Sequence, residues 1–252
     1  MKKIPVIAAF GVSLLTALPC VSYAAEGAHW TYEGHAGAKH WGDLEKEYAT
    51  CKLGRYQSPI DIETSKIKAA DSEPIKLAYS GASAQVSNTG HSVQVDPVDG
   101  GSITVDGVDY KLVQFHFHTP SEEKINGRHH AMVAHLVHRS ADGKLAVIAV
   151  LFDLGKENRT LKPVFANLPA KAGDKRPLDG TINAGEIVPD NHASFMFEGS
   201  LTTPPCSEEV HWIVMKTPMT ISSRQLDAFK KLYPMNARPT QPLNGRTVQA
   251  GR

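Results

Sequence analysis

Short stretches of β-type residues, separated by turn residues, run through nearly the whole chain, and this alternation constrains the fold more than any other feature of the sequence. Runs rich in β-branched and aromatic residues, bounded by Gly, Asn and Asp, are typical of strands joined by tight turns. The strongest turn signals are Asp99-Gly100-Gly101, Asp106-Gly107 and Asn126-Gly127. The predicted strands cover residues 83–87, 91–95, 102–105, 110–118, 131–137, 145–152, 193–197 and 210–216.

Two further patterns complete the prediction of the fold class. Residues 145–151 are nearly all apolar, which indicates a strand buried on both faces. Helical periodicity is clear only at residues 222–232, where Ser222 or Ser223 would cap the helix, and it is weaker at residues 158–168. No repeat or linker divides the chain, so we expect one β-rich domain with a few peripheral helices.

The first 24 residues have the pattern of a secretory signal peptide. Met1-Lys2-Lys3 supplies positive charge, residues 4–18 carry no charge, and Ser22-Tyr23-Ala24 fits the small-x-small cleavage rule. The uncharged run is short for a membrane span. We predict removal of residues 1–24, export to the periplasm and a mature domain of residues 25–252. An N-terminal anchor helix and a lipoprotein modified at Cys20 are the weaker alternatives.

Charge gives no reason to expect a nucleic acid or an anionic membrane as partner. The formal net charge is +1, and it falls to −1 when Lys2 and Lys3 leave with the signal peptide. Nucleic-acid binding depends on a surplus of positive charge. We therefore predict a small-molecule substrate, no nucleic-acid partner and no membrane contact after cleavage, while a homodimer stays open.

The cysteines predict a disulfide. Cys20 leaves with the signal peptide, so Cys51 and Cys206 remain as an even pair in an oxidising compartment. A bond between them would close a loop of about 155 residues and contribute roughly 4–5 kcal/mol in the chain-entropy model. Two buried free thiols and a two-cysteine metal site are the alternatives.

Residues 114–118, Gln-Phe-His-Phe-His, alternate with a period of two. On a strand, His116 and His118 project from one face and the phenylalanines from the other. Two imidazoles spaced in this way can share a metal ion, and three around one Zn²⁺ leave a fourth position for water, which is typical of a catalytic site. A pair of hydrogen-bonded histidines without metal is the alternative. Spacing alone does not choose a third ligand among His129, His130, His135 and His138.

Seven motifs, in order along nearly the whole mature chain, resemble those of the alpha-class carbonic anhydrases. Residues 199–206, Gly-Ser-Leu-Thr-Thr-Pro-Pro-Cys, are the most specific, and Ser121-Glu122 follow residues 114–118 as in the family. The other motifs are residues 29–32 with 40–41, 57–61, 88–91, 135–138 and 236–243. The resemblance implies a single mainly β (α+β) domain around a large, mostly antiparallel, twisted β-sheet with a few short peripheral helices. It also implies the reversible hydration of carbon dioxide to bicarbonate and a proton.

By the same resemblance, the cofactor is Zn²⁺ and its ligands are His116, His118 and His135. The nucleophile would be a hydroxide at the open position of the ion, formed from a water whose pKa near 7 is the value known for this family itself. Thr202 would accept a hydrogen bond from the hydroxide and donate its own proton to Glu122, which orients the nucleophile. Thr203 would contact bicarbonate or water, and an ordinary turn hydroxyl is the alternative.

The remaining implied residues concern the substrate and the proton. Four side chains would line an apolar pocket for carbon dioxide, although the sequence alone favours plain core for them: Val137, Val147, Leu201 and Trp212. His91 matches the family's proton shuttle, a role that suits an imidazole with a pKa near 6.5, and an ordinary surface histidine is the alternative. Tyr32, Thr89 and Gln94 would line the water path, and Gln114 would support a zinc ligand.

Two positions depart from the family's pattern. Val133 stands where the family usually has a glutamate that accepts the second N–H of the third ligand, and Glu123 stands where a polar or histidine residue is common. Loss of such a partner typically costs about 10–100-fold in metal affinity or activity, so we expect an active but weakened enzyme. Glu123 also adds a negative charge that raises the pKa of nearby groups. Val133 is the one feature that favours an inactive binding protein of the same family, and a periplasmic zinc carrier is a third hypothesis.

Overall fold

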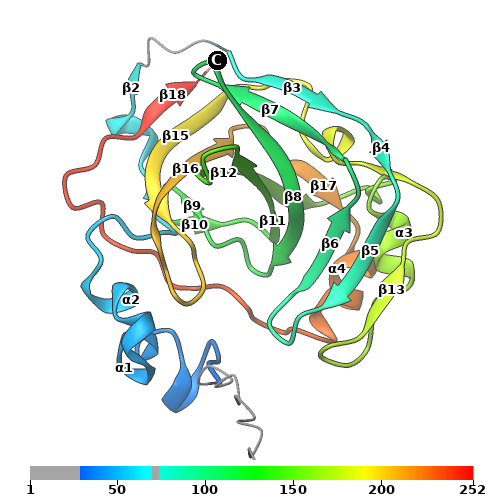
Figure 1. Ribbon diagram of the computed structural model, residues 1–252, viewed down its shortest axis with the longest axis horizontal. Coiled ribbons are helices and arrows are strands. Elements are labelled where there is room, and N and C mark those ends of the chain that lie inside the picture. The colour runs from blue at the N-terminus through cyan, green and yellow to red at the C-terminus, as the bar shows by residue number, and fades with distance from the viewer. Residues whose placement is uncertain (1–28, 70–73, 252) are drawn as a thin grey trace, which may run out of the picture.

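The alternating segments form strands of one large twisted sheet in the computed structural model, which describes residues 29–69 and 74–251 (Figure 1). Thirteen strands formed by these residues belong to it. Its main path runs β13 (Lys175–Pro177), β5 (Ala84–Asn88), β6 (Val93–Pro97), β8 (Val108–His118), β11 (Met132–Ser140), β12 (Leu145–Leu154), β16 (Glu208–Met215), β15 (Ser194–Ser200), β18 (Gln249–Gly251) and β2 (Lys68–Ala69). The predicted signal peptide, residues 1–24, lies outside the described residues.

Three more strands attach beside this path. β7 (Gly101–Val105) pairs with β8 and with β3 (Lys76–Tyr79), and β17 (Met219–Ile221) pairs with β12. Most pairings are antiparallel, and the parallel ones within this sheet are β12 with β16, β12 with β17, and β18 with β2. The prediction of a large, mostly antiparallel, twisted sheet is therefore confirmed.

Short strands outside the main sheet pair in two small groups. β1 (Asp61–Ile62), β9 (Lys124–Ile125) and β10 (Arg128–His129) form one, and β4 (Gly81–Ala82) with β14 (Ile182–Asn183) forms the other. Asn126 and Gly127 join β9 to β10 with φ of +51° and +78°, and Asp106 and Gly107 join β7 to β8 with φ of +48° and +78°. Both predicted turns thus adopt the left-handed backbone that Asn, Asp and Gly tolerate best.

The helices are short and lie around the sheet (Figure 1). They are α1 (Trp41–Leu44), α2 (Thr50–Leu53), α3 (Lys162–Ala166) and α4 (Ser223–Lys230), with 3-10 turns at Gly34–Ala36, Lys46–Tyr48, Thr64–Lys66 and Ala184–Ile187. The two predicted helices, residues 158–168 and 222–232, correspond to α3 and α4 but are longer than the helices observed. No helix in the described ranges has the length and apolar character needed to span a bilayer.

The sheet separates two apolar clusters, because side chains alternate across it. Phe115 and Phe117 of β8 pack into the larger cluster, whereas Val133 of β11 belongs to the smaller cluster on the other face. β12 supplies residues to both clusters and is buried over most of its length, as its apolar sequence predicts. The face that holds the smaller cluster is the one to which His116 and His118 project.

Candidate metal centre

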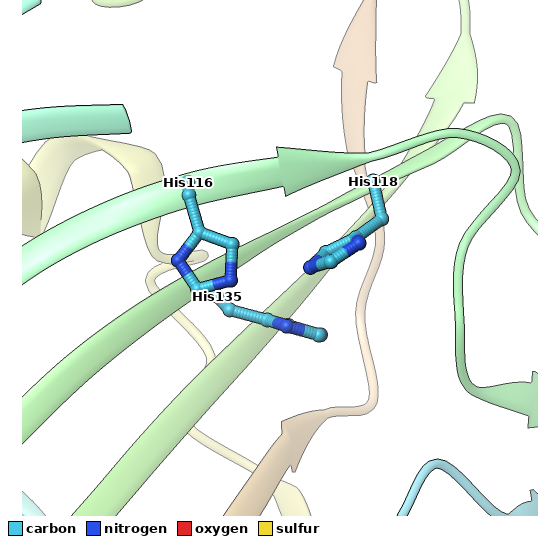
Figure 2. Close-up of side chains that lie close together, drawn as sticks. All are labelled: His116, His118 and His135. Atoms are coloured by element: carbon cyan, nitrogen blue, oxygen red, sulfur yellow. The ribbon is translucent and has the colours of Figure 1, made fainter. Parts of the chain in front are cut away.

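Three histidines of two neighbouring strands turn toward one another near the middle of the sheet (Figure 2). His116 and His118 are alternate residues of β8, and His135 of β11 lies directly opposite His116 in the antiparallel register. One potential ligand nitrogen from each ring lies within 4.8 Å of the other two. His118 and His135 are buried and His116 is half-buried. The strand register alone therefore brings together the three predicted zinc ligands.

Each ring of β8 has its outer nitrogen fixed by a partner. The Nδ1 atom of His116 lies 2.8 Å from Oε1 of Gln114, two residues earlier on the same face. The Nδ1 atom of His118 lies 2.7 Å from the backbone carbonyl of Asn236. A carbonyl oxygen only accepts hydrogen bonds, so the Nδ1 atoms carry the protons and each Nε2 atom presents a lone pair to the centre.

The ring of His135 is fixed in the opposite sense. Its Nε2 atom lies 3.2 Å from Oε1 and 3.3 Å from Oε2 of Glu123, which leaves Nδ1 to face the other two histidines. Val133, two residues earlier on β11, is fully buried in the smaller apolar cluster. The sequence left the acceptor for this ring open, and the structure identifies it as the carboxylate of Glu123.

Burial determines the protonation of the two histidines of β8. It lowers the pKa of His116 to about 3, and the neighbouring His135 adds to the effect. It also holds the pKa of His118 well below the ordinary value, with His135 and His116 contributing. Both rings are therefore neutral near pH 7, and neutral imidazole is the form that binds a metal ion.

Carboxylates change the balance at His135. Burial lowers its pKa, but the negative charges of Glu123 and Glu122, together with the hydrogen bond to Glu123, outweigh burial and raise the pKa. Glu122 and Glu123 thus place two buried carboxyl groups beside the three rings, and their negative charge makes the local potential more negative. A negative potential favours a cation at the point where the three rings meet.

The donor set fits Zn²⁺. Three imidazole nitrogens with a position left for water form one of the ligand sets that zinc takes in catalytic sites, as in carbonic anhydrase itself. The Nε2 atom of His118 is buried and has no hydrogen-bond partner among the described residues, so an ion at the centre would satisfy a polar atom that is otherwise unpaired. Within the described ranges, this is the one group of three or more such side chains whose ligand atoms converge so closely.

Glu122 and Thr202 lie buried beside the three rings. The backbone N–H of Arg238 donates to Oε1 of Glu122 at 2.7 Å. Burial raises the pKa of Glu122 to about 7; His135 opposes this shift and Glu123 adds to it, while hydrogen bonds from Thr202 and Arg238 oppose it. Thr202 thus lies close enough to influence this carboxyl group, and a hydroxyl can donate its proton to a carboxylate while its oxygen accepts another hydrogen bond.

The loop that carries Thr202 and Thr203 is held from both sides. The backbone N–H of Leu201 donates to the carbonyl of Ser207 at 2.9 Å, and that of Cys206 donates to the carbonyl of Thr203 at 2.9 Å. Cys206 forms a disulfide with Cys51 of α2, with Cα atoms 5.0 Å apart, which confirms the predicted pairing. Thr203 is half-buried in this turn.

The four predicted pocket residues belong to one apolar cluster beside His135. Val137, Val147 and Trp212 lie opposite one another on β11, β12 and β16, so they form a row across three strands. Leu201 packs against the same cluster. The ring of Trp212 meets that of His135 edge-on, with centroids 4.9 Å apart. This row places apolar surface directly next to one of the three converging imidazole rings.

His91 lies on the loop between β5 and β6. Its ring stacks on Trp30 with centroids 3.6 Å apart, and His29 lies 5.9 Å away. Partial burial lowers the pKa of His91, and the charge of His29 lowers it further. The hydroxyl of Thr89 accepts hydrogen bonds from the backbone N–H groups of His91 and Ser92, so it shapes the turn that carries the imidazole.

Tyr32 and Gln94 lie nearer the centre. Burial raises the pKa of Tyr32 well above its usual value, and the charge of Glu122 adds to this effect. The hydroxyl of Tyr32 is buried without a hydrogen-bond partner among the described residues. Gln94 of β6 lies directly opposite His116 of β8 and donates to Asp96 at 2.6 Å.

The other histidines that the sequence offered as ligands lie elsewhere. His129 contacts the carbonyl of Ser121 at 2.5 Å, and His130 contacts Asp153 at 2.8 Å. His138 lies 2.7 Å from the hydroxyl of Tyr79. A register shift between Val137 and His138 accompanies this change of face. The phase of β11, which the sequence does not reveal, thus selects His135.

The sequence analysis did not predict the contacts that three further residues make at the site. Glu123 was noted only as a departure, Asn236 holds His118 through its carbonyl, and Arg238 holds Glu122 through its N–H. The amide of Asn236 also donates to the carbonyls of His91 and Phe117. Membership of the motif at residues 236–243 was the available signal, but it did not say which groups these residues contact.

Comparisons with known proteins agree with this geometry. Residues 36–252 match the family model described as eukaryotic-type carbonic anhydrase. A carbonic anhydrase of Klebsiella pneumoniae is 41% identical, covering 94% of this chain and 97% of its own length.

Solved structures give the same result. The alpha-carbonic anhydrase of Thermovibrio ammonificans, in complex with the inhibitor sulfanilamide, superposes with a TM-score of 0.86 at 44% identity and covers 88% of this chain and 99% of its own. The alpha-carbonic anhydrase of Photobacterium profundum has a TM-score of 0.83 at 41% identity, covering 88% and 100%.

Proposed function

The chain belongs to the eukaryotic-type carbonic anhydrase family, whose general reaction is the hydration of carbon dioxide, and from this premise we propose that it is a zinc enzyme with His116, His118 and His135 as ligands. The reaction is the reversible conversion of carbon dioxide and water to bicarbonate and a proton. The observation that carries the proposal is the convergence of three imidazole nitrogens whose opposite ring nitrogens each contact an oxygen of Gln114, Asn236 or Glu123.

A bound Zn²⁺ supplies one piece of chemistry, which is known for carbonic anhydrase itself: it lowers the pKa of water to about 7 and so provides hydroxide near neutral pH. Thr202 then orients this nucleophile. Because its proton is directed to Glu122, its oxygen accepts a hydrogen bond and turns a lone pair of the nucleophile toward the substrate carbon. Thr203, on the same turn, is proposed to contact the bicarbonate product.

The apolar row of Val137, Val147 and Trp212, with Leu201, receives carbon dioxide. Carbon dioxide has no net dipole, so an apolar surface beside the nucleophile binds it without the cost of breaking polar contacts. Bicarbonate is charged and finds no partner on this surface, which favours its release.

Each turnover of the hydration reaction leaves a proton to be carried to solvent, and His91 is the group proposed to carry it. An imidazole can both take up and release a proton, and the lowered pKa of His91 favours the release. Its position on a solvent-facing loop, stacked on Trp30, suits transfer to buffer. Tyr32, Thr89 and Gln94 are proposed to order the water along the path.

The alternative of an inactive binding protein rested on Val133. The contact between His135 and Glu123 weakens that argument, because the ring has a carboxylate acceptor after all. A zinc carrier is also disfavoured, since the three histidines lie on two adjacent strands of the sheet rather than in a mobile His-rich tract.

The proposal is tested by carbon dioxide hydration and zinc content measured on one preparation of residues 25–252. We expect about one zinc per chain and hydration activity that His116→Ala abolishes. His130→Ala is the matched control, because His130 contacts Asp153 outside the centre and should leave both quantities unchanged. A protein that holds zinc and does not hydrate carbon dioxide would refute the catalytic role.

We also propose that the protein is exported and acts in the periplasm. The disulfide between Cys51 and Cys206 supports an oxidising compartment. Cell fractionation with N-terminal sequencing of the mature protein tests this, and a chain that retains Met1 in the cytoplasm contradicts it.

A further inference from the structure

Glu123 is a buried carboxylate whose position calls for an explanation. Its side chain is fully buried, and in the part of the chain that the structure describes its carboxylate has one polar contact, the Nε2 atom of His135 at 3.2 Å. No lysine or arginine in that part forms an ion pair with it. Burying a carboxylate without a compensating positive charge is unfavourable, so a structural role alone does not explain it.

The loop between β8 and β9 holds Glu123 at this point. The hydroxyl of Ser121 donates to the carbonyl of Glu123 at 2.7 Å, and the N–H of Ser121 donates to the carbonyl of His130 at 3.0 Å. The next residue, Lys124, donates its N–H to the carbonyl of Ile60 at 3.2 Å. The backbone on both sides of Glu123 is thus anchored, and the carboxylate has little freedom to leave the ring.

β11 offers no alternative acceptor on the face of His135. Val133 is the residue two positions earlier on that face; it is fully buried and lies opposite His118 and Leu151 on the neighbouring strands. A valine there packs against the apolar cluster and contributes no acceptor. The acceptor for the N–H of the His135 ring is therefore Glu123 on a loop, and not a residue of β11.

We propose that Glu123 is the positioning carboxylate of the metal centre, which orients the His135 ring and strengthens its Nδ1 atom as a ligand. Glu123 thus supplies, from the β8–β9 loop, the acceptor that Val133 on β11 does not provide. The inference rests on the proposed zinc site. It reverses the expectation of a weakened enzyme, because the ring of His135 has an acceptor.

The first test measures zinc dissociation into excess chelator. Glu123→Gln keeps the shape of the side chain but removes its charge, and we expect it to weaken zinc binding about 10–100-fold. His138→Gln is the matched control, a buried histidine on the same strand but on the opposite face, and its zinc dissociation should equal that of the wild type. A Glu123→Gln protein that retains zinc as well as the wild type overturns the inference.

Restoring the strand carboxylate provides a second test. Val133→Glu in the Glu123→Gln background should recover slow zinc dissociation, because the new carboxylate starts two residues from His135 on the same face. Val133→Glu alone should bring no gain, since the acceptor is already present. A gain from the single change would show that the His135 ring lacks an effective partner in the wild type and would refute the proposal.

A direct readout does not depend on whether any variant folds. In the zinc-loaded wild type, the Nε2 proton of His135 should appear in nitrogen-15-edited proton spectra as a slowly exchanging, downfield resonance, as expected for an N–H that donates to a buried carboxylate. In Glu123→Gln this resonance alone should move upfield, while those of His116 and His118 stay in place. Rapid exchange of the His135 proton in the wild type would contradict the contact.

The outcomes separate the two proposals. A wild type without zinc refutes the proposed function, whereas a zinc-loaded wild type with an unaffected Glu123→Gln variant refutes only the role of Glu123.

Discussion

Glu122 and Glu123 are neighbours in the sequence, and both are buried, yet they serve different groups. Glu122 accepts from the N–H of Arg238 and faces Thr202, whereas Glu123 faces the Nε2 atom of His135. One carboxylate therefore acts on the proposed nucleophile through a hydroxyl, and the other acts on a metal ligand through its ring. On the proposed assignment, two adjacent residues of one loop would act on the nucleophile and on a metal ligand of the same centre.

The division predicts how Thr202 variants behave. Thr202→Val removes the hydroxyl at nearly constant shape, so we expect kcat/KM for hydration to fall by about 100-fold or more, the usual effect of removing one preorganised hydrogen bond. Zinc content should not change, because Thr202 is not a ligand. Thr202→Ser retains the hydroxyl and should keep most of the activity. Equal activities of the valine and serine variants in a stopped-flow assay would exclude the proposed role.

His138 gives a prediction about pH and stability. Burial lowers its pKa to about 4, although hydrogen bonds with backbone groups of β11 and β12 oppose this shift. The unfolded chain, with a histidine pKa near 6.5, takes up a proton as pH falls from about 6.5 to 4, and the native state does not. A group that binds more protons when unfolded destabilises the fold as pH decreases through this window.

We therefore compare urea unfolding of the metal-free wild type and His138→Gln at pH 7.5 and pH 5. Between these values the wild type should lose about 2 kcal/mol more stability than the variant, since the glutamine does not titrate. Other buried histidines contribute equally to both proteins and cancel in the difference. Parallel pH dependence of the two proteins would mean that His138 does not have the lowered pKa.

Local spacing alone predicts only part of the site, and the resemblance of the motifs supplied the rest, including His135. His116 and His118 share a face because a strand has a period of two, and this holds without knowledge of the fold. The choice of His135 over His138 depends on how β11 aligns with β8, which no local pattern contains. The contact of His118 with the carbonyl of Asn236 joins residues 118 positions apart, so local spacing could not predict it either.

At the scale of elements, α4 shows how a local signal fixes a boundary. The hydroxyl of Ser222 accepts from the N–H of Gln225 at 3.3 Å, and the side chain of Gln225 accepts from the N–H of Ser222 at 3.2 Å. This reciprocal cap resolves the sequence ambiguity between Ser222 and Ser223 in favour of the former. Gln225 also bonds to both backbone groups of Asn158, so the cap connects α4 to the segment before α3.

The cap predicts unequal effects of two serine substitutions. Ser222→Ala should lower the free energy of unfolding by about 1 kcal/mol, because it leaves the N–H of Gln225 without its acceptor. Ser223→Ala is the control at an exposed helical position and should change the same quantity by less than about 0.5 kcal/mol. Chemical denaturation of the two variants decides the matter, and equal effects would argue against the cap.

Strand positions were predictable to within a few residues, whereas strand pairing was not. Turn signals such as Asp106-Gly107 place hairpins, so the neighbours β7 and β8 follow from the sequence. The run that forms β12 is buried on both faces and carries no periodicity from which to infer a partner. Its parallel pairing with β16 joins segments some 65 residues apart (Leu145 with Val210), which no local pattern predicts. The predicted helix at residues 222–232 differs from α4 by only one to two residues at each end, which is the usual uncertainty of a helix boundary, whereas the one at residues 158–168 extends further beyond α3.

At the scale of the whole molecule, the disulfide connects the two regions that flank the site. Cys51 lies in α2 near the N-terminus, and Cys206 closes the turn that carries Thr202 and Thr203. The guanidinium of Arg238 donates to the carbonyl of Cys51 at 3.0 Å, while its backbone N–H donates to Glu122. The covalent link and Arg238 thus hold the N-terminal segment against the reacting centre from two directions.

The separation of 155 residues between the cysteines predicts a large effect on stability. Cys51→Ser combined with Cys206→Ser should lower the free energy of unfolding by roughly 4–5 kcal/mol, because the unfolded chain regains the freedom that so long a loop removes. The double change avoids a free thiol, and a reducing agent added to the wild type should shift its denaturation midpoint in the same direction. The same agent should leave the double variant unchanged, which separates reduction of this bond from other effects. The double variant could instead unfold at the same denaturant concentration as the oxidised wild type. In that case native contacts alone would hold α2 against the turn that carries Thr202 and Thr203, and the disulfide would not contribute to the free energy of unfolding.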